Sequence, residues 1–479
     1  MIKSIHMRYW TLILVSGLLL FNACNNQPKR PNIILVVVDD LGAHDVGFMG
    51  STYYETPNID KLAAGGTVFS NAYAAAANCS PTRASIMTGK YPARLGITDW
   101  IRPSVWRDGT EDANAYVSDP GKKLMCPHYP LKLDTAEVTL AEVLQKAGYV
   151  TMHIGKWHLG GPGYLPEDQG FDYNFAGFDF GQPPSYYAPY TSDWAPGGIP
   201  KIMPETEDEY LTDREALEAV KFIKENKDRP FFLNLWHYAV HTPIQPKEEY
   251  EAYFNTKTAS TGQKNPRYAA MIKSVDDAMG ILMEALKEEG LERNTLVIFF
   301  SDNGGHNGYT SNAPLRSGKG NPWEGGIREP MVMHWPGKIP PGSVFSSPVS
   351  SIDLLPTLNG IAGGTLPAGA DVDGLDFFPS LMGESAFNRE DLFWHFPHYR
   401  SYEDVRPFSI VRSGDWKLIR FWEGYNELYN LVEDPSETMD VSAKQAEKVN
   451  ELESKLDQWL KETGARVPVV NPEYVEDLN

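Results

Sequence analysis

Apolar runs alternate with amphipathic stretches along most of the 479-residue chain. A short continuous apolar run is typical of a buried parallel strand, because helices cover both faces of such a strand. The stretches between the runs repeat apolar residues at the spacing of an amphipathic helix. The pattern predicts strands at residues 32–38, 150–154, 231–236, 295–300 and 331–335, and helices at 139–147, 212–226, 267–289 and 353–361. Thr212 or Asp213 is the expected N-cap of the second helix. We therefore expect an α/β fold, with a mostly parallel sheet sandwiched by helices.

The pattern changes after about residue 385. Short strand-like runs separated by turn residues are typical of an antiparallel meander, and a charged amphipathic helix follows them. The runs lie at 409–412, 416–421 and 427–431, and the helix at 443–460. We predict a large domain at 31–385 and a small C-terminal α+β domain at 386–479. Two long stretches, 102–136 and 160–210, are rich in Pro, Gly and aromatic residues and are expected to form lids or pocket walls.

The N-terminus has the order of an export signal: basic residues, an apolar core at 9–21, then Cys24 and a polar run. The core is short for a membrane-spanning helix. The arrangement resembles a bacterial lipoprotein signal, with residues 1–23 removed and Cys24 lipidated. Phe21 stands where that signal usually has Leu, so ordinary cleavage is the alternative, and a buried N-terminal helix is a further one. We expect a protein exported to the periplasm, or anchored to the outer membrane, of a Gram-negative bacterium, with the lipid as its only membrane contact.

Composition excludes several classes of protein. The 42% hydrophobic and 22% charged residues are unlike a disordered chain or a coiled coil. The net charge of −20 argues against nucleic acid as a partner, because phosphate contacts need Lys and Arg. The three cysteines cannot build a disulfide scaffold.

Polar clusters follow four of the predicted strands. Asp39-Asp40 ends the first, residues 155–158 the second, His237 and His241 follow the third, and residues 301–305 end the fourth. In open parallel sheets, ligands bind beside the carboxyl ends of the strands. Four such clusters predict one shared active site.

The oxygen ligands among these residues favour a hard cation, Ca²⁺ or Mg²⁺. They are Asp39, Asp40, Asp302 and Asn303. A lone Asp-Asp pair could equally cap a turn, so the second cluster carries the prediction. Zinc on the histidines, His158, His237 and His241, is the alternative. Lys156 argues against zinc, because a cation beside His158 would repel the metal.

Cys79 opens a predicted helix that ends at Gly89. It would lie at the helix N-terminus, where anions are favoured, with Arg83 on the same face. A buried structural cysteine is the plainer interpretation.

The segment 79–89 reads Cys-x-Pro-x-Arg followed by four residues and Thr-Gly, and this resembles the motif of the sulfatase family at every fixed position. The other family motifs resemble this chain in the same order: Asp39-Asp40, Gly-Lys-Trp-His at 155–158, His241-Thr242-Pro243, Ser-Asp-Asn-Gly at 301–304, Lys319 in a Gly-rich turn, and the C-terminal runs 416–418 and 427–431. The resemblance spans about residues 31–465. It implies an alkaline-phosphatase-like fold and hydrolysis of sulfate esters.

The resemblance also implies a role for each matching residue. Cys79 is oxidised by a maturation enzyme to formylglycine, whose hydrated aldehyde attacks sulfur and then expels sulfate. One Ca²⁺ is held by Asp39, Asp40, Asp302, Asn303 and the modified Cys79. Arg83 stabilises the hydrate with His158 beside it, Lys156 and Lys319 bind the sulfate oxygens, and His241 protonates the leaving alcohol. With Cys24 lipidated and Cys79 converted, Cys126 has no partner for a disulfide.

Two alternatives remain. A phosphatase or phosphodiesterase of the same superfold would need two zinc sites and a Ser or Thr nucleophile. An inactive glycan-binding lipoprotein would need a broken site.

The expected substrate is a sulfated carbohydrate, attacked at a terminal sugar in a walled pocket. Segment 238–245 resembles sulfatases that act on galactose-type sugars, so galactose or N-acetylgalactosamine is expected, with O4 favoured and O6 next. Residues near the motifs could read sugar hydroxyls, although each could also be an ordinary loop residue. They are His44, Asp99, Arg102, His237 and His306.

Overall fold

The computed structural model describes residues 30–106, 115–400 and 404–475. The predicted signal peptide and Cys24 lie outside the described residues, as does part of the predicted loop at 102–136. Among the helices of the described ranges, none has both the length and the apolar character that crossing a bilayer requires.

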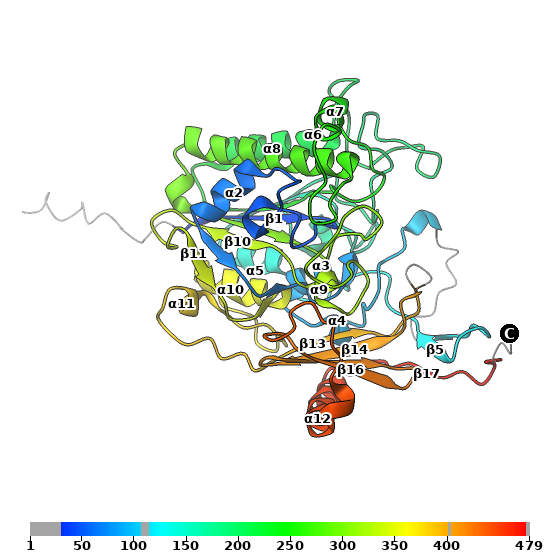
Figure 1. Ribbon diagram of the computed structural model, residues 1–479. Helices are drawn as coiled ribbons and strands as arrows, with labels where there is room; N and C mark the ends of the chain where they lie inside the picture. Colours follow the sequence, from blue (N-terminus) through cyan, green and yellow to red (C-terminus); the bar gives the residue numbers. More distant parts are fainter. Residues whose placement is uncertain (1–29, 107–114, 401–403, 476–479) are drawn as a thin grey trace, which may run out of the picture.

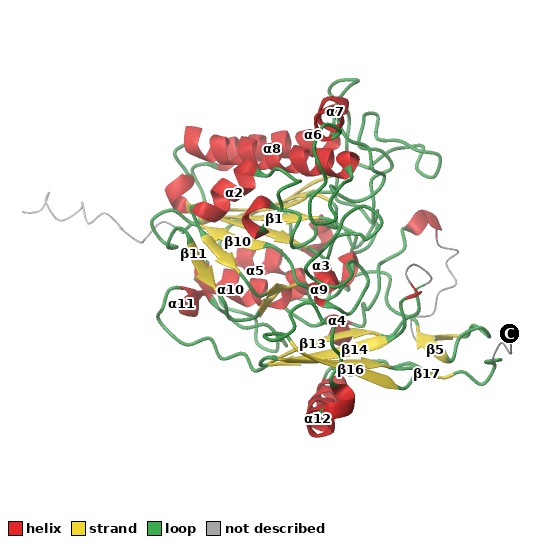
Figure 2. Ribbon diagram, viewed as in Figure 1, coloured by secondary structure: helices red, strands yellow, loops and turns green. Residues whose placement is uncertain are grey.

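An eight-stranded sheet forms the centre of the larger part of the molecule (Figures 1 and 2). Its order is β11-β2-β10-β9-β1-β8-β6-β7. Strand β10 is antiparallel to both of its neighbours, and every other adjacent pair is parallel. The strands are β1 (Asn32–Val38), β2 (Thr67–Phe69), β6 (Val150–Gly155), β7 (Tyr173–Phe175), β8 (Phe231–Trp236), β9 (Thr295–Ser301), β10 (Met331–His334) and β11 (Ser343–Phe345). The predicted mostly parallel sheet is confirmed.

Helices cover both faces of this sheet. The side chains of β1 point alternately to the two faces, and both sets are apolar, so each face needs a covering layer. Ile34 and Val36 pack in one apolar cluster with the helices above the sheet in Figure 1, and Ile33 and Leu35 pack in a second cluster with those below it. The first layer consists of α2 (Pro57–Ala64), α6 (Leu211–Asn226), α7 (Glu248–Phe254) and α8 (Pro266–Glu288). The second consists of α3 (Cys79–Thr88), α5 (Leu140–Lys146), α10 (Leu354–Ile361) and α11 (Phe378–Leu381).

The predicted cap of α6 is wrong. The helix begins at Leu211, after Tyr210, and no side chain caps it. The backbone N–H of Leu211 donates to the carbonyl oxygen of Tyr186 at 2.8 Å, so a distant segment satisfies a group that a cap would otherwise serve.

A four-stranded antiparallel sheet and one helix form the small C-terminal part, drawn in orange to red in Figure 1. The elements are β13 (Asp391–Phe396), β14 (Phe408–Ser413), β15 (Trp416–Phe421), β16 (Tyr425–Asn430) and α12 (Ala446–Glu462). One face of the sheet packs Ile410 and Ile419 against Tyr73 of the larger part, and the other packs Leu418 against α12. The meander and its helix are as predicted, whereas β13 is an additional strand.

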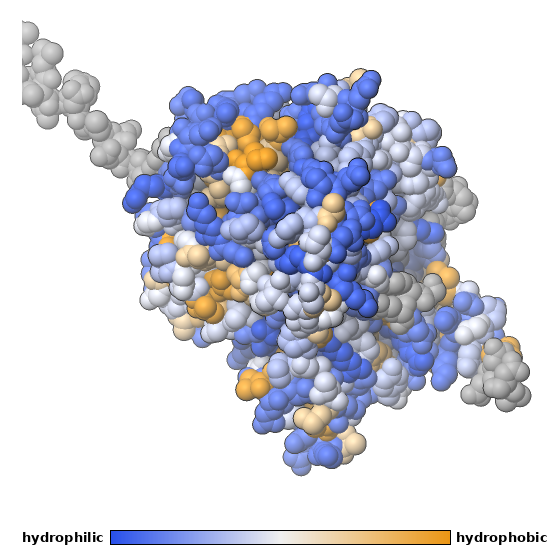
Figure 3. Space-filling view, turned by 45° about the horizontal axis from the view of Figure 1, so that its top comes forward, coloured by the Kyte–Doolittle hydropathy of each residue, from blue (hydrophilic) through white to orange (hydrophobic). Residues whose placement is uncertain are grey.

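The remaining elements are short. They are α4 (Pro92–Leu95), α9 (Glu324–Ile327), β3 (Ala72–Tyr73), β4 (Tyr116–Val117), β5 (Leu124–Pro127), β12 (Val349–Ser350) and β17 (Val469–Val470), with 3-10 turns between them. Hydrophilic residues dominate the face shown in Figure 3, where apolar residues gather only in small separate patches.

Candidate active site

Four strand ends meet at one edge of the large sheet. Strands β9, β1, β8 and β6 are consecutive neighbours, and their carboxyl ends point the same way because all of them are parallel. The polar clusters that follow them therefore lie side by side, as the sequence predicts. This edge holds two carboxylates after β1, two polar residues after β9, the histidines after β8 and Lys156 after β6.

Helix α3 carries Cys79 and Arg83 to the same edge. Every residue of this helix is buried. The Arg83 guanidinium donates through Nε to Asp302 Oδ2 at 2.9 Å and through Nη1 to the carbonyl oxygen of Lys156 at 2.8 Å. It also lies 5.0 Å from the centre of the Trp236 ring. Arg83 thus fastens the helix to the ends of three strands and fixes Cys79 beside the carboxylates.

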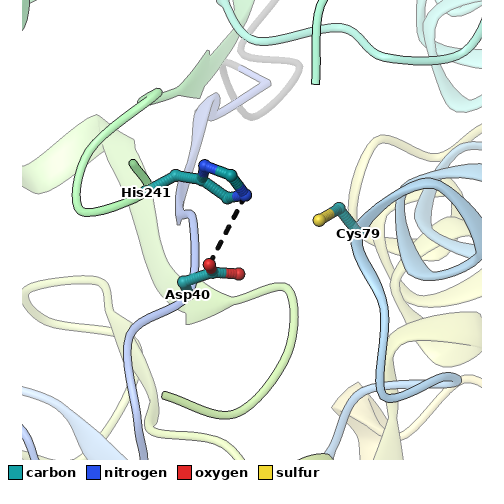
Figure 4. A group of neighbouring side chains, drawn as sticks. All are labelled: Asp40, Cys79 and His241. Atoms are coloured by element: carbon teal, nitrogen blue, oxygen red, sulfur yellow. Dashed lines mark ion pairs between the residues drawn. The ribbon is translucent and has the colours of Figure 1, made fainter. Parts of the chain in front are cut away.

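Potential metal-ligand atoms lie near the Cys79 sulfur in two groups. One potential ligand atom from each of Asp39, Cys79 and Asp302 lies within 4.8 Å of the others, and the same holds for Asp40, Cys79 and His241 (Figure 4). Among the described residues, these are the groups of three His, Cys, Asp or Glu side chains close enough to hold a metal ion. Asn303 completes the set, because its Nδ2 donates to Asp40 Oδ1 at 2.8 Å. The predicted oxygen-ligand set is therefore brought together.

Cations compensate the carboxylates unequally. Lys156 Nζ lies 2.5 Å from Asp39 Oδ2, and Lys319 Nζ lies 2.6 Å from Asp40 Oδ1. Burial raises the pKa of Asp39 to about 8, and repulsion from Asp302 adds to the effect more than Lys156 offsets. Burial would also raise the pKa of Asp40, but Lys319 and then His241 outweigh it and hold this pKa below its ordinary value. Asp39 is therefore harder to ionise than Asp40, although Lys156 and Arg83 lie beside it.

A divalent cation would stabilise the ionised form of Asp39. Asp39 Oδ1 and Asn303 Oδ1 are buried and accept no hydrogen bond within the described part of the chain. Unpartnered buried acceptors are costly unless a cation or donor meets them. An all-oxygen set of three carboxylates and one amide matches Ca²⁺ or Mg²⁺ better than zinc.

The three candidate zinc histidines do not share a site. His237 Nδ1 lies 2.6 Å from Glu215 Oε2, and both side chains are fully buried. His158 Nε2 lies 2.7 Å from the carbonyl oxygen of Ile101. Within the described ranges, the groups of side chains that could hold a metal contain neither His237 nor His158. The zinc alternative therefore has no geometric support.

His241 faces the carboxylate cluster. Its Nε2 lies 3.6 Å from Asp40 Oδ2, on the side of the ring that points toward Cys79 (Figure 4). Its Nδ1 lies 3.1 Å from the carbonyl oxygen of Thr242, which suits a proton on that nitrogen. Burial and Lys319 lower the pKa of His241 well below its ordinary value, against the opposing effect of Asp40.

A cavity of about 320 Å³ opens above Cys79. Four of the predicted catalytic residues line it: Cys79, His158, His241 and Lys319. Its other walls are formed by Asn78, Trp100, Trp106, Gly181, Gln182, Thr242, His306 and Arg400. Arg83, Lys156 and the carboxylates lie behind this lining.

The comparisons with known proteins agree with this geometry. A family model described as Sulfatase matches residues 31–364, and one described as N-sulphoglucosamine sulphohydrolase, C-terminal, matches residues 319–465. Arylsulfatase A of Homo sapiens is 35% identical over 426 residues, which cover 83% of this chain and 76% of that protein. N-acetylgalactosamine-6-sulfatase of Canis lupus familiaris is 34% identical over 403 residues, which cover 79% of this chain and 71% of that protein. The crystal structure of Ps i-CgsB in complex with k-i-k-neocarrahexaose has a TM-score of 0.76 and 34% identity, and covers 94% of this chain and 96% of that chain.

The chain belongs to the sulfatase family. It is an enzyme that hydrolyses sulfate esters, and its α/β fold is that of the family. Both statements confirm the predictions from the sequence.

Of the five sugar contacts expected in this sulfatase, His306 alone lines the cavity. Asp99 lies behind the wall, where its Oδ1 accepts a hydrogen bond from Asn78 at 2.9 Å. His44 is held apart, with Nδ1 2.7 Å from the carbonyl oxygen of Met49. His237 is buried beside Glu215, and Arg102 is not among the lining residues.

Several wall residues of the sulfatase escaped the sequence analysis. Trp106 and Gln182 lie in the two stretches expected to form pocket walls, so the aromatic and amide residues of those stretches were the available signal. Trp100 and Thr242 adjoin the predicted residues Asp99 and His241. Arg400 had no local signal, since it comes from the small domain.

The Cys79 thiol of the sulfatase is a poor nucleophile in this environment. Burial raises its pKa to about 11, against the opposing effects of Lys156 and Lys319. The thiolate, which is the reactive form, is therefore scarce at neutral pH. Cys79 and Cys126 are both free and buried.

Proposed function

We propose that this sulfatase removes sulfate from galactose or N-acetylgalactosamine, using a formylglycine formed from Cys79 and one calcium ion. The observation that carries the proposal is the cavity itself. Its lining joins Cys79, a lysine and a histidine to two tryptophans, Trp100 and Trp106. The first group suits a sulfate ester, and the aromatic rings suit a sugar ring.

The calcium ion would be held by the oxygen-rich cluster together with residue 79. Its ligands would be Asp39, Asp40, Asp302, Asn303 and the modified Cys79. When bound, calcium supplies positive charge to the sulfate oxygens and to the oxygen on residue 79. The unpartnered oxygens of Asp39 and Asn303 support this assignment. The raised pKa of the Cys79 thiol supports a nucleophile other than the thiolate.

The other side chains of the site bind the sulfate, stabilise the modified residue 79 or transfer a proton. Lys319 in the cavity wall and Lys156 behind the lining attract the sulfate oxygens. Arg83 and His158 stabilise the hydroxyl groups of the modified residue 79. When its ring is doubly protonated, His241 carries a proton on Nε2 and gives it to the departing sugar oxygen, which is a poor leaving group without it. An anionic sulfate in the cavity opposes the field of Lys319 and so favours the protonated histidine.

The size of the cavity and the relatives support the substrate class. A volume of about 320 Å³ is near the lower end for small-molecule sites and suits one terminal sugar rather than an internal unit of a long chain. The canine relative is named for N-acetylgalactosamine-6-sulfate, and the similar crystal structure holds a neocarrahexaose. We retain O4 and O6 as the two positions, and the canine relative favours O6.

The alternatives receive less support. A phosphatase or phosphodiesterase would need two zinc sites, whereas the potential metal groups of the described residues both include Cys79. An inactive glycan-binding protein would need a broken site, whereas the motif residues and their contacts are all present. We further propose export through the N-terminal signal, modification by a formylglycine-generating enzyme, and domains at 31–385 and 386–479.

A panel of sulfated sugars tests the proposal. The protein is produced in cells that contain the maturation enzyme, and kcat/KM is measured on galactose and N-acetylgalactosamine sulfated at O4 or O6. Glucosamine and uronic-acid sulfates, long sulfated polysaccharides and phosphate esters serve as comparisons. Release of sulfate from a terminal galactose-type sugar supports the proposal. Activity confined to glucosamine or uronic-acid sulfates, or internal attack on long chains, contradicts the substrate and leaves the family assignment intact.

A further inference from the structure

Arg400 reaches the catalytic cavity from the small C-terminal domain. It follows β13 and lines the same cavity as Cys79 and Lys319. The other lining cation, Lys319, is paired with Asp40 of the carboxylate cluster. Arg400 instead pairs with Asp99, which is not one of the carboxylates of the proposed metal site.

Arg400 is held firmly in this position. Its side chain is 15% exposed, and Nη2 lies 2.9 Å from Asp99 Oδ1. The same carboxylate oxygen accepts hydrogen bonds from Asn78 Nδ2 at 2.9 Å and from the backbone N–H of Trp100 at 2.8 Å. Asn78 directly precedes Cys79 in the chain. Asp99 therefore ties Arg400 to the segment that carries the nucleophile.

The guanidinium also lies against the backbone beside Lys319. A Cβ atom at position 320 would come within 2.7 Å of Arg400 Nη1, so a larger residue there would displace the guanidinium. Gly320 has a φ of +84°, which other residues rarely adopt. The backbone N–H of Arg400 donates to the carbonyl oxygen of Val405 at 2.9 Å, and its guanidinium carbon lies 5.6 Å from the centre of the Phe396 ring.

This environment suits a neutral polar partner. An arginine has five N–H donors, and the one side-chain hydrogen bond that Arg400 makes within the described residues uses a single donor. The ion pair with Asp99 offsets the charge of Arg400, so a second sulfate or a carboxylate would gain less here than beside an unpaired arginine. A hydroxyl oxygen gains a charge-assisted hydrogen bond from a fixed donor.

Resting on the proposed function, we infer that Arg400 is a specificity-determining residue that donates a hydrogen bond to a hydroxyl of the sulfated sugar. Asp99 is its positioning residue. The hydrolytic residues act on the sulfate end of the substrate, whereas Arg400 binds a hydroxyl of its sugar. An aryl sulfate has no such hydroxyl, so the two substrate types separate the roles.

The test compares Arg400→Gln with a matched variant, Arg420→Gln. Arg420 lies in the same domain, is 14% exposed and pairs with Asp457 at 2.5 Å, but is not among the cavity residues. We measure kcat/KM on the best sugar sulfate and on an activated aryl sulfate, and take their ratio. The ratio should fall about 10- to 100-fold in Arg400→Gln, as expected for a lost hydrogen bond to a charged donor, and stay within about 2-fold in Arg420→Gln. Asp99→Asn should lower the ratio less than Arg400→Gln.

Monodeoxy analogues of the sugar sulfate identify the hydroxyl. One analogue should be a poor substrate for the wild-type enzyme and should lose nothing further in Arg400→Gln, because both changes remove the same hydrogen bond. Equal losses on sugar and aryl sulfates would overturn the inference, and so would a loss that appears only with disulfated or carboxylated sugars. A wild-type enzyme inactive on every sugar sulfate but active on aryl sulfate would contradict the proposed function instead.

Discussion

At the scale of single residues, the surroundings of Cys79 disfavour the thiolate form of its side chain. A catalytic thiolate needs a lowered pKa, usually from a nearby cation or a helix N-terminus. Cys79 has both, since it begins α3 and lies in the fields of Lys156 and Lys319. Burial nevertheless outweighs them and raises the thiol pKa to about 11. The thiolate, which is the reactive form of cysteine, is therefore scarce at neutral pH, and this agrees with the proposed modification of Cys79.

The first prediction concerns that change. Protein from cells with the maturation enzyme should yield a Cys79 peptide whose mass matches the aldehyde, and Cys79→Ala should abolish turnover while keeping the wild-type Tm. Cys79→Ser is the matched control, because it restores a nucleophile of similar size without the aldehyde. Full activity from protein in which mass analysis finds only unmodified cysteine would falsify the proposed mechanism.

The second prediction concerns calcium. Removal of the ion with a chelator should abolish activity, and added Ca²⁺ should restore it and raise Tm, because the ion binds the folded state. Asp302→Ala should lose the calcium-dependent rise in Tm, since it removes one of the buried carboxylates. Asp172→Ala, a carboxylate outside the site, should retain the rise. Stoichiometric zinc in fully active protein would contradict the assignment.

The third prediction concerns His241. General acid catalysis matters most for poor leaving groups and contributes about 10²- to 10⁴-fold. His241→Ala should therefore lower kcat on a sugar sulfate by about that factor, and on an activated aryl sulfate by much less. Equal losses on both substrates would reassign His241 from proton transfer to binding.

At the scale of secondary structure, the sequence predicted what depends on local pattern. The apolar runs of β1, β8 and β9 and their polar ends follow from burial on both faces, and they locate the catalytic edge. The sequence did not predict that β10 runs antiparallel, because an apolar run carries no direction. The sequence analysis also missed β13, which begins a few residues after the pattern changes near residue 385. Its side chains point alternately to the two apolar clusters of the small sheet.

The contact between α2 and α8 gives the fourth prediction. Asp276 on α8 accepts hydrogen bonds from the backbone N–H groups of Asn58 and Ile59, at 2.8 and 3.0 Å, in the first turn of α2. Burial raises its pKa to about 6 from an ordinary value of 3.8. The folded state therefore holds this proton more tightly than the unfolded state between about pH 4 and pH 6, and stability falls as pH rises through that range.

Asp276→Asn keeps an acceptor oxygen and removes the titration. Relative to this variant, the free energy of unfolding of the wild type should fall by no more than about 3 kcal/mol between pH 4 and pH 7. Chemical unfolding at several pH values measures the difference, with Glu284→Gln on the exposed side of α8 as the control for losing a helix carboxylate. Parallel pH profiles for the wild type and Asp276→Asn would contradict the prediction.

At the scale of the whole molecule, the small C-terminal part contributes Arg400 to the lining of the cavity above Cys79. Arg400 closes a cavity whose floor is carried by Cys79, and the two positions are separated by more than 300 residues. Such a contact depends on how two packed units fit together, which no local pattern encodes. This is why the sequence located the polar residues at the strand ends, whereas most of the other residues that line the cavity were not predicted.

The fifth prediction tests the packing between the two units. Trp394 on β13 is 2% exposed, donates from Nε1 to the carbonyl oxygen of Ala74 at 2.7 Å, and meets the Tyr73 ring edge-on. Trp394→Ala should lower the free energy of unfolding by about 3–5 kcal/mol. Val432→Ala, at a site that is 71% exposed, should change it by less than about 0.5 kcal/mol. A small loss in Trp394→Ala, measured by chemical unfolding, would show that this contact contributes little.

The central place of β1 has a consequence for synthesis of the protein. Asn32 on β1 pairs with Thr295 on β9, 263 positions later, and β8 on the other side also comes late in the chain. At about 5–20 residues per second, β1 waits on the order of ten seconds to a minute for its second neighbour. Until β8 is made both edges of this apolar strand are open, and one stays open until β9 is made, so it can associate with other nascent chains. A chain that stops before Thr295 should therefore aggregate rather than fold as a smaller enzyme, and production of the intact protein should improve with slower synthesis and more chaperone.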